Sequence, residues 1–165
     1  MRKAAILLIV SLTLISCLFE TPYTLTPVKE AVIIEDLKGI FHEPSDSTKV
    51  KISIDENIYT FHFFNSKDSL ESKHSGFISD LNGVKFLNFD GRNQLKNTNA
   101  EPQYQYYKVT QINRDQFKFN PVVDSLFKDK QFKHAQEFRK YFKSQLDQPA
   151  LINTDKNEII LNKIN

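Results

Sequence analysis

The chain of 165 residues contains no tryptophan, one cysteine, four glycines and six prolines. A single cysteine cannot form a disulfide within the chain, so a disulfide-stabilised fold is excluded. The scarcity of glycine and proline excludes collagen-like and low-complexity sequences. With so few glycines, the sequence also has no glycine-rich phosphate-binding loop and no Gly-x-Ser-x-Gly nucleophile elbow, which excludes the common nucleotide-binding and serine-hydrolase motifs.

Aromatic residues are abundant instead, with 14 phenylalanines and six tyrosines, and 40% of all residues are hydrophobic. This length and composition predict one globular domain with a hydrophobic core. Lys and Arg together number 22, against 20 Asp and Glu. Two of the basic residues, Arg2 and Lys3, stand at the N-terminus, and without them the charges balance at 20 each. Because binding to phosphates requires clustered basic residues, we expect no nucleic-acid partner.

The first 17 residues have the organisation of a secretory signal. Arg2 and Lys3 form a short basic start, and residues 4–15 that follow include only two polar side chains. This apolar run is too short to span a bilayer as a permanent helix. It ends in Leu14-Ile15-Ser16-Cys17, which contains the single cysteine of the chain.

Leu14-Ile15-Ser16-Cys17 resembles the lipobox of bacterial lipoproteins, in which a small residue precedes the lipid-modified cysteine. The resemblance implies that residues 1–16 are removed and that Cys17 carries diacylglycerol on its thiol and a fatty acid such as palmitate on its new amino group. The protein would then be held by this lipid anchor on the cell membrane or outer membrane, outside the cytoplasm. Two alternatives stay open: an ordinary secretory signal with a chance cysteine, and an uncleaved membrane anchor.

The mature chain divides into a tether and a domain. Residues 17–32 contain Pro22, Pro27 and three threonines without a regular apolar period. Such a composition predicts a flexible tether that follows the lipidated cysteine. Residues 33–165 are then expected to form a single globular α+β domain.

Three hairpins are predicted in the first part of this domain. Val50, Ile52 and Ile54 alternate with polar residues, which is typical of a half-buried strand. The pair Asn82-Gly83 between two apolar runs is a strong signal for a hairpin turn, because both residues tolerate positive φ. Residues 65–75 are polar and predict a long loop. The predicted strand pairs are 49–54 with 58–64, 77–81 with 84–89, and 104–112 with 116–119, and residues 158–164 are a candidate final strand.

The apolar period changes after these hairpins. Asn120-Pro121 is typical of a helix start, and residues 122–127 form a short apolar stripe. A second helix is predicted from Ala135 to Leu146, with Pro149 beyond its end. The predicted fold is therefore an α+β domain, an antiparallel β meander or partial barrel of about six strands followed by two C-terminal helices.

Gly39-Ile40-Phe41 is similar to the Gly-x-aromatic motif at the first strand of lipocalin-like barrels, with Phe41 where tryptophan is usual. This resemblance implies a barrel with an interior for apolar ligands. The order of hairpins and helices from residue 36 to residue 165 also resembles small uncharacterised bacterial lipoproteins, a likeness that implies no known activity.

Residues for catalysis, cofactor binding or metal binding do not cluster in the sequence, since the four histidines stand singly. Tyr104, Tyr106 and Tyr107 form a candidate ligand surface, because aromatic faces stack on flat or apolar molecules. The alternative interpretation is packing, with Tyr104 and Tyr106 on one side of a strand and Tyr107 on the other.

We therefore expect a membrane-anchored, non-enzymatic lipoprotein with a structural or protein-interaction domain, which an envelope protein would bind. The alternative is a lipocalin-like carrier of an apolar small molecule. A third hypothesis is an envelope hydrolase whose site is assembled from scattered residues. The first two differ in whether Phe61, Phe63, Phe77 and Phe86 fill the interior of the domain or surround a cavity.

Overall fold

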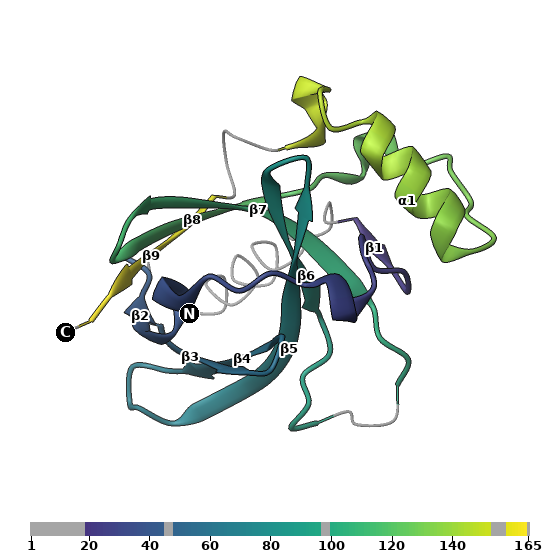
Figure 1. Ribbon diagram of the computed structural model, residues 1–165. Helices are drawn as coiled ribbons and strands as arrows, with labels where there is room; N and C mark the ends of the chain where they lie inside the picture. The colour runs from purple at the N-terminus through teal and green to yellow at the C-terminus, as the bar shows by residue number, and fades with distance from the viewer. Residues whose placement is uncertain (1–18, 45–47, 97–99, 153–157, 165) are drawn as a thin grey trace, which may run out of the picture.

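The computed structural model describes residues 19–44, 48–96, 100–152 and 158–164, whose main element is a barrel of antiparallel strands (Figure 1). Within these residues there is one α-helix, α1 (Ala135–Ser144), which lies beside one wall of the barrel. The strands are β1 (Glu20–Thr21), β2 (Gly39–His42), β3 (Lys49–Asp55), β4 (Ile58–Phe64), β5 (Leu70–Leu81), β6 (Val84–Asp90), β7 (Tyr104–Asn113), β8 (Gln116–Pro121) and β9 (Ile159–Lys163).

Eight of these strands, β2 to β9, form a closed barrel. Each strand from β2 to β8 pairs with the next one along the chain, and β9 pairs with both β8 and β2. All of the pairs are antiparallel, and β1 lies outside the ring against the start of β7. Because the last strand joins the first, the hydrogen-bonding groups of β2 and β8 have partners on both sides.

The prediction of an α+β fold with about six strands and two helices is wrong. Gly39–His42 forms an additional barrel strand, and residues 70–75, assigned to a loop from their polarity, are the first half of β5. Residues 122–127 form no α-helix, because the N–H of Val122 donates to the carbonyl of Tyr106 (2.8 Å) and continues the extended chain. A single 3₁₀ turn, Asp124–Leu126, follows.

The hairpin predicted at Asn82-Gly83 is confirmed. Asn82 and Gly83 both have positive φ, 57° and 85°, and they connect β5 to β6. Two consecutive residues in the left-handed region are typical of the tight turn whose twist matches that of the flanking strands. The turn therefore fixes the β5–β6 register, in which Leu81 lies opposite Val84.

One end of the barrel is closed by the chain between β1 and β2, which runs across it (Figure 1). Leu37 is fully buried in the barrel interior. The N–H of Ile34 donates to the hydroxyl of Tyr59 (2.7 Å), and Val32 forms a β-bridge with Ile78 on β5. Burying one leucine side chain contributes about 2 kcal/mol, so this segment is a structural part of the barrel.

The Gly39-Ile40-Phe41 motif stands at the start of the first barrel strand. Phe41 is fully buried, and the Nζ of Lys163 on β9 lies 5.6 Å from its ring centre. The same Nζ donates to the carbonyl of Asp36 (2.9 Å). Gly39 has a φ of 150°, and a Cβ there would lie 2.6 Å from the Cε of Lys163. Any other residue would be strained at this φ, and its Cβ would push the lysine side chain aside.

A second hydrophobic core lies outside the barrel, beneath α1. Phe138 and Phe142 are fully buried on one face of the helix, where Phe142 meets Phe86 of β6 edge to face at 5.3 Å. His134 caps the helix by accepting a hydrogen bond from the N–H of Glu137. The wall formed by β5, β6 and β7 is consequently apolar on both faces, with one core on each side.

Residues 19–25, in the described part of the expected tether, are packed against this outer core. The ring of Phe19 stacks on Phe127 with 4.2 Å between centroids, and Leu25 is buried. The N–H of Leu25 donates to the Oδ1 of Asn88 (2.8 Å). The Nδ2 of Asn88 in turn donates to the hydroxyl of Ser79 (2.8 Å). Aromatic and leucine side chains among the prolines and threonines account for this packing, because they bury apolar area.

Replacing Asn88 with alanine is expected to destabilise the fold by about 1–3 kcal/mol, because the buried N–H of Leu25 and the hydroxyl of Ser79 lose a partner. Chemical denaturation measures this change. Asn162→Ala is the control, since Asn162 accepts one hydrogen bond, from Gln116, in a partly exposed pair. Equal destabilisation by the two variants would contradict the role given to Asn88.

Candidate ligand-binding site

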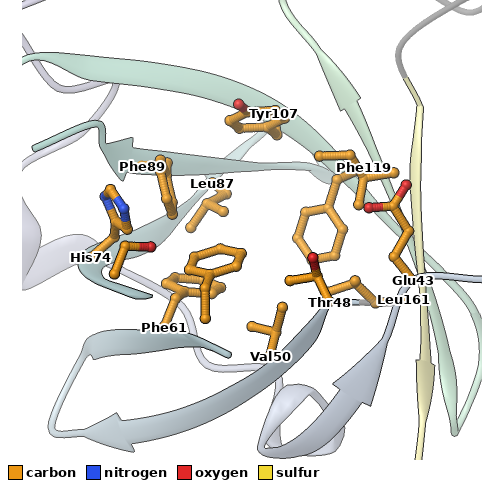
Figure 2. A pocket seen from close by; sticks show the side chains of 13 residues that line it. Glu43, Thr48, Val50, Phe61, His74, Leu87, Phe89, Tyr107, Phe119 and Leu161 are labelled. Carbon is orange, nitrogen blue, oxygen red and sulfur yellow. The ribbon is translucent and has the colours of Figure 1, made fainter. Parts of the chain in front are cut away.

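A cavity of about 720 Å³ lies inside the barrel, in the half away from the closing segment, and is partly open to solvent (Figure 2). Its walls come from seven of the eight barrel strands and from the chain between β2 and β3. The lining residues are Glu43, Thr48, Val50, Phe61, Phe63, Ser72, His74, Leu87, Phe89, Tyr107, Phe119, Ile159 and Leu161.

The alternation of side chains along the strands places these residues inside. On β4, Phe61 and Phe63 face the interior while His62 between them points outward, as expected when successive side chains alternate. Leu87 and Phe89 do the same on β6. Six of the seven lining strands therefore contribute one or two aromatic or aliphatic side chains to the cavity, and β5 contributes Ser72 and His74.

The lining side chains pack against one another around the cavity. Phe89 meets Phe61 edge to face at 5.4 Å and Tyr107 at 6.1 Å. It also stacks on the imidazole of His74 at 5.0 Å, while Phe63 approaches that imidazole edge to face at 5.7 Å. Ring pairs of this geometry hold each other in place, so the aromatic wall of the site exists before any ligand enters.

The polar groups of the cavity stand on its opposite sides. Figure 2 shows His74 on one side of the space and Glu43 and Thr48 on the other. The Nδ1 of His74 lies 3.1 Å from the carbonyl oxygen of Asp90. Because a carbonyl can only accept, Nδ1 carries a proton, which leaves Nε2 as the acceptor in the neutral ring.

Tyr107 adds a hydroxyl that stays protonated. Burial raises the pKa of Tyr107 to about 12, with a smaller contribution from the charge of Glu20. The hydroxyl donates to the Oε1 of Gln105 (3.0 Å). The described lining of the cavity contains no lysine or arginine. An anionic group inside would therefore have no permanent cation among these residues to balance it.

The three tyrosines of the candidate ligand surface do not lie together. Tyr107 lines the cavity, whereas Tyr104 and Tyr106 belong to the outer core. Tyr106 is buried beneath α1, and its hydroxyl donates to the carbonyl of Tyr23. Burial raises its pKa well above the ordinary value for tyrosine. Tyr104 meets Phe77 edge to face at 6.5 Å.

The four phenylalanines that separate the carrier hypothesis from the interaction-module hypothesis divide in the same way. Phe61 and Phe63 border the cavity, while Phe86 packs under α1 and Phe77 faces outward beside Tyr104. Sequence reasoning missed Ser72 and His74, because the polar stretch that contains them indicated a loop. The alternation of Ser72, His74 and Gly76 with their neighbours is present but lacks apolar residues to make it visible.

Other kinds of site are not seen in the described residues. No group of three His, Cys, Asp or Glu side chains gathers there as metal ligands would. Within the same ranges no helix is long and apolar enough to cross a membrane. Cys17 and the lipobox residues before it lie outside the described part of the chain.

No protein-family model matches this chain, and comparisons with curated proteins and with solved structures gave no match.

His62 lies outside the cavity on the outer wall, between two lysines. In the strand register it stands directly opposite Lys51 on β3 and Lys73 on β5. Its Nδ1 is buried and has no hydrogen-bond partner in the residues described. Burial lowers the pKa of His62, and the charges of Lys73 and Lys51 lower it further. The imidazole is therefore a structural group whose protonation opposes folding.

The folded protein is expected to lose stability as the pH falls from about 7.5 to 5, because the unfolded chain, with an ordinary histidine pKa of about 6.5, takes up a proton that folded His62 resists. His62→Gln should reduce this pH dependence. Lys73→Gln should reduce it less, since burial remains. Thermal unfolding across the pH range measures the slope, and an unchanged slope in His62→Gln would refute this account.

Proposed function

We propose that this protein is a membrane-anchored lipoprotein whose barrel binds a small, uncharged, apolar molecule in its interior. The cavity of about 720 Å³, lined mainly by aromatic and aliphatic side chains, is the observation that carries this proposal. Its volume is in the range of about 300–1,000 Å³ typical of small-molecule sites. A domain acting through its outer surface alone has no use for an interior of this kind, so the cavity favours the carrier hypothesis over the interaction-module hypothesis.

The lining indicates what the ligand looks like. Phe61, Phe89 and Leu87 offer ring and methyl surfaces to an apolar body. The Nε2 of His74 and the hydroxyl oxygen of Tyr107 can accept hydrogen bonds that would orient it. Because no lysine or arginine is among the described lining residues, an alcohol, amide or ester fits this lining better than a carboxylate of the same length.

The hydrogen bonding of His74 and Ser72 favours ligand binding over catalysis. The Nδ1 of His74 is directed to a main-chain carbonyl rather than to a carboxylate that would strengthen a catalytic base. A hydrogen bond from Ser72 to His74, which a serine nucleophile would need, is not found among the described residues. The hydrolase hypothesis therefore has no geometric support at the cavity, where the apolar surface dominates.

Membrane attachment is the second part of the proposal and is based on the sequence. Leu14-Ile15-Ser16-Cys17 after a basic start and an apolar run supports lipidation of Cys17 and a location outside the cytoplasm. Two or three acyl chains anchor a protein firmly, where one chain would bind only marginally and reversibly.

The purified domain is expected to bind the uncharged dye Nile red with increased dye fluorescence, because the dye would leave water for an apolar cavity. Leu87→Trp, which fills the cavity, should weaken binding by about tenfold or more through lost apolar burial. Ile40→Trp is the matched control, because Ile40 is exposed on the outer side of β2. Thermal unfolding of both variants checks that they are folded.

Competition against the dye tests the ligand class. A long-chain alcohol should displace Nile red at lower concentration than the fatty acid of equal length, since the acid carries its charge into a cavity lined without a lysine or arginine in the described residues. Equal dye binding by Leu87→Trp and the wild type would place the dye elsewhere and contradict the proposed carrier function.

Intact mass spectrometry of the membrane-extracted protein is expected to show a mature chain that starts at Cys17 and carries a diacyl or triacyl adduct. Cys17→Ala should abolish both the adduct and the cleavage, because the thiol is the group that accepts the lipid. An unlipidated wild-type protein in the medium or the soluble fraction would contradict the anchor.

A further inference from the structure

The N-terminal end of the described chain is held firmly against the outer core. Phe19 stacks on Phe127 and lies 6.0 Å from the rings of both Tyr106 and Phe138. A few residues later, the Nε of Arg139 on α1 donates to the carbonyl of Thr24 (2.8 Å). The chain is thus attached to α1 and to the loop before it from Phe19 onward.

This attachment leaves little chain between the barrel and the lipid. Cys17 and Phe19 are two residues apart, a distance of at most about 7 Å between Cα atoms. A lipid on Cys17 would therefore hold the neighbourhood of Phe19 at the bilayer surface, because no long linker intervenes. The side of the molecule that faces the membrane is then the side that carries Phe127 and α1.

Basic side chains gather in this part of the chain. Residues 128–143 contain six Lys and Arg but only two Asp and Glu, which leaves the rest of the chain from residue 17 with 14 basic and 18 acidic residues. Five of the six are exposed lysines, and none of the five forms an ion pair with a described residue. They are Lys128, Lys130, Lys133, Lys140 and Lys143.

Three of these lysines follow closely in sequence on the residue against which Phe19 packs. Lys128, Lys130 and Lys133 occupy the loop directly after Phe127, the residue on which Phe19 stacks. Lys130 also lies with its Nζ 5.3 Å from the ring centre of Tyr141 on α1. The loop and helix therefore present a cationic surface beside the point where the lipid would emerge.

We propose that this surface, the lysines of residues 128–143, contacts anionic phospholipid headgroups and orients the barrel on the membrane. This orientation rests on the proposed lipid anchor, and the attraction comes from lysines that form no ion pair with a described residue. Lysine side chains within a Debye length of an anionic bilayer are attracted to it, and the attraction adds to that of an acyl anchor.

Cosedimentation of the unlipidated chain 17–165 carrying Cys17→Ser with vesicles tests the surface independently of the anchor. We expect binding to equal parts of phosphatidylcholine and phosphatidylglycerol, weak binding to phosphatidylcholine alone, and release at high salt. The combined change Lys128→Gln, Lys130→Gln and Lys133→Gln should lower the affinity by on the order of 100-fold at low salt, because each lysine near the surface contributes about fivefold.

The matched control removes three lysines elsewhere, with Lys51→Gln, Lys67→Gln and Lys96→Gln, all of which are exposed. This control should change the affinity less than tenfold. The proposal would be overturned if both triple variants lowered the vesicle affinity equally, or if binding did not depend on phosphatidylglycerol. Loss of lipid on Cys17 in cells together with intact, lysine-dependent vesicle binding would instead refute the anchor and leave the surface standing.

Discussion

The closure of the barrel by β9 is the constraint on which the rest of the structure depends. Leu161 of β9 lies opposite Phe117 of β8, while Lys163 lies opposite Phe41 of β2. Without this strand, β2 and β8 would be open edges and the cavity would lack the wall formed by Ile159 and Leu161. The helix and its flanking loops lie between β8 and β9 in the chain.

A single wall of the barrel separates two cores with different properties. On β6, Leu87 and Phe89 face a cavity with free space, whereas Phe86 on the same strand faces a closely packed aromatic cluster beneath α1. The packing under α1 stabilises the wall from outside, which lets the inside keep unfilled volume at less cost to the fold. The packed outer core therefore stabilises a wall whose other face borders the cavity.

Turn chemistry and alternation made the hairpins predictable, because these signals are local. Asn82-Gly83 fixes its own conformation, and Val50, Ile52 and Ile54 show their common face in sequence. Closure was not predictable in this way, because it pairs β2 with a strand about 120 residues later and depends on no local motif. Residues 122–127 were misassigned because a short apolar stripe fits a helix or an extended chain equally well.

The site was even less accessible from sequence than the fold. Phenylalanines that fill a core and phenylalanines that border a cavity have the same local pattern, so Phe61 and Phe86 could not be told apart. The tyrosine triplet divided between the two faces of β7, as alternation on one strand requires. His74 escaped notice because its role comes from Phe89 and Asp90 on the neighbouring strand.

The proposed ligand site and the proposed lipid anchor lie at the same end of the barrel. β1 pairs with Tyr104 and Gln105 at the start of β7, and Tyr107 two residues later lines the cavity. An anchor two residues before Phe19 would therefore hold the open half of the barrel close to the bilayer. Apolar molecules concentrate in membranes because water excludes them. A barrel held in this position would exchange its ligand with the lipid phase over a short distance, which a barrel on a long tether could not do reliably.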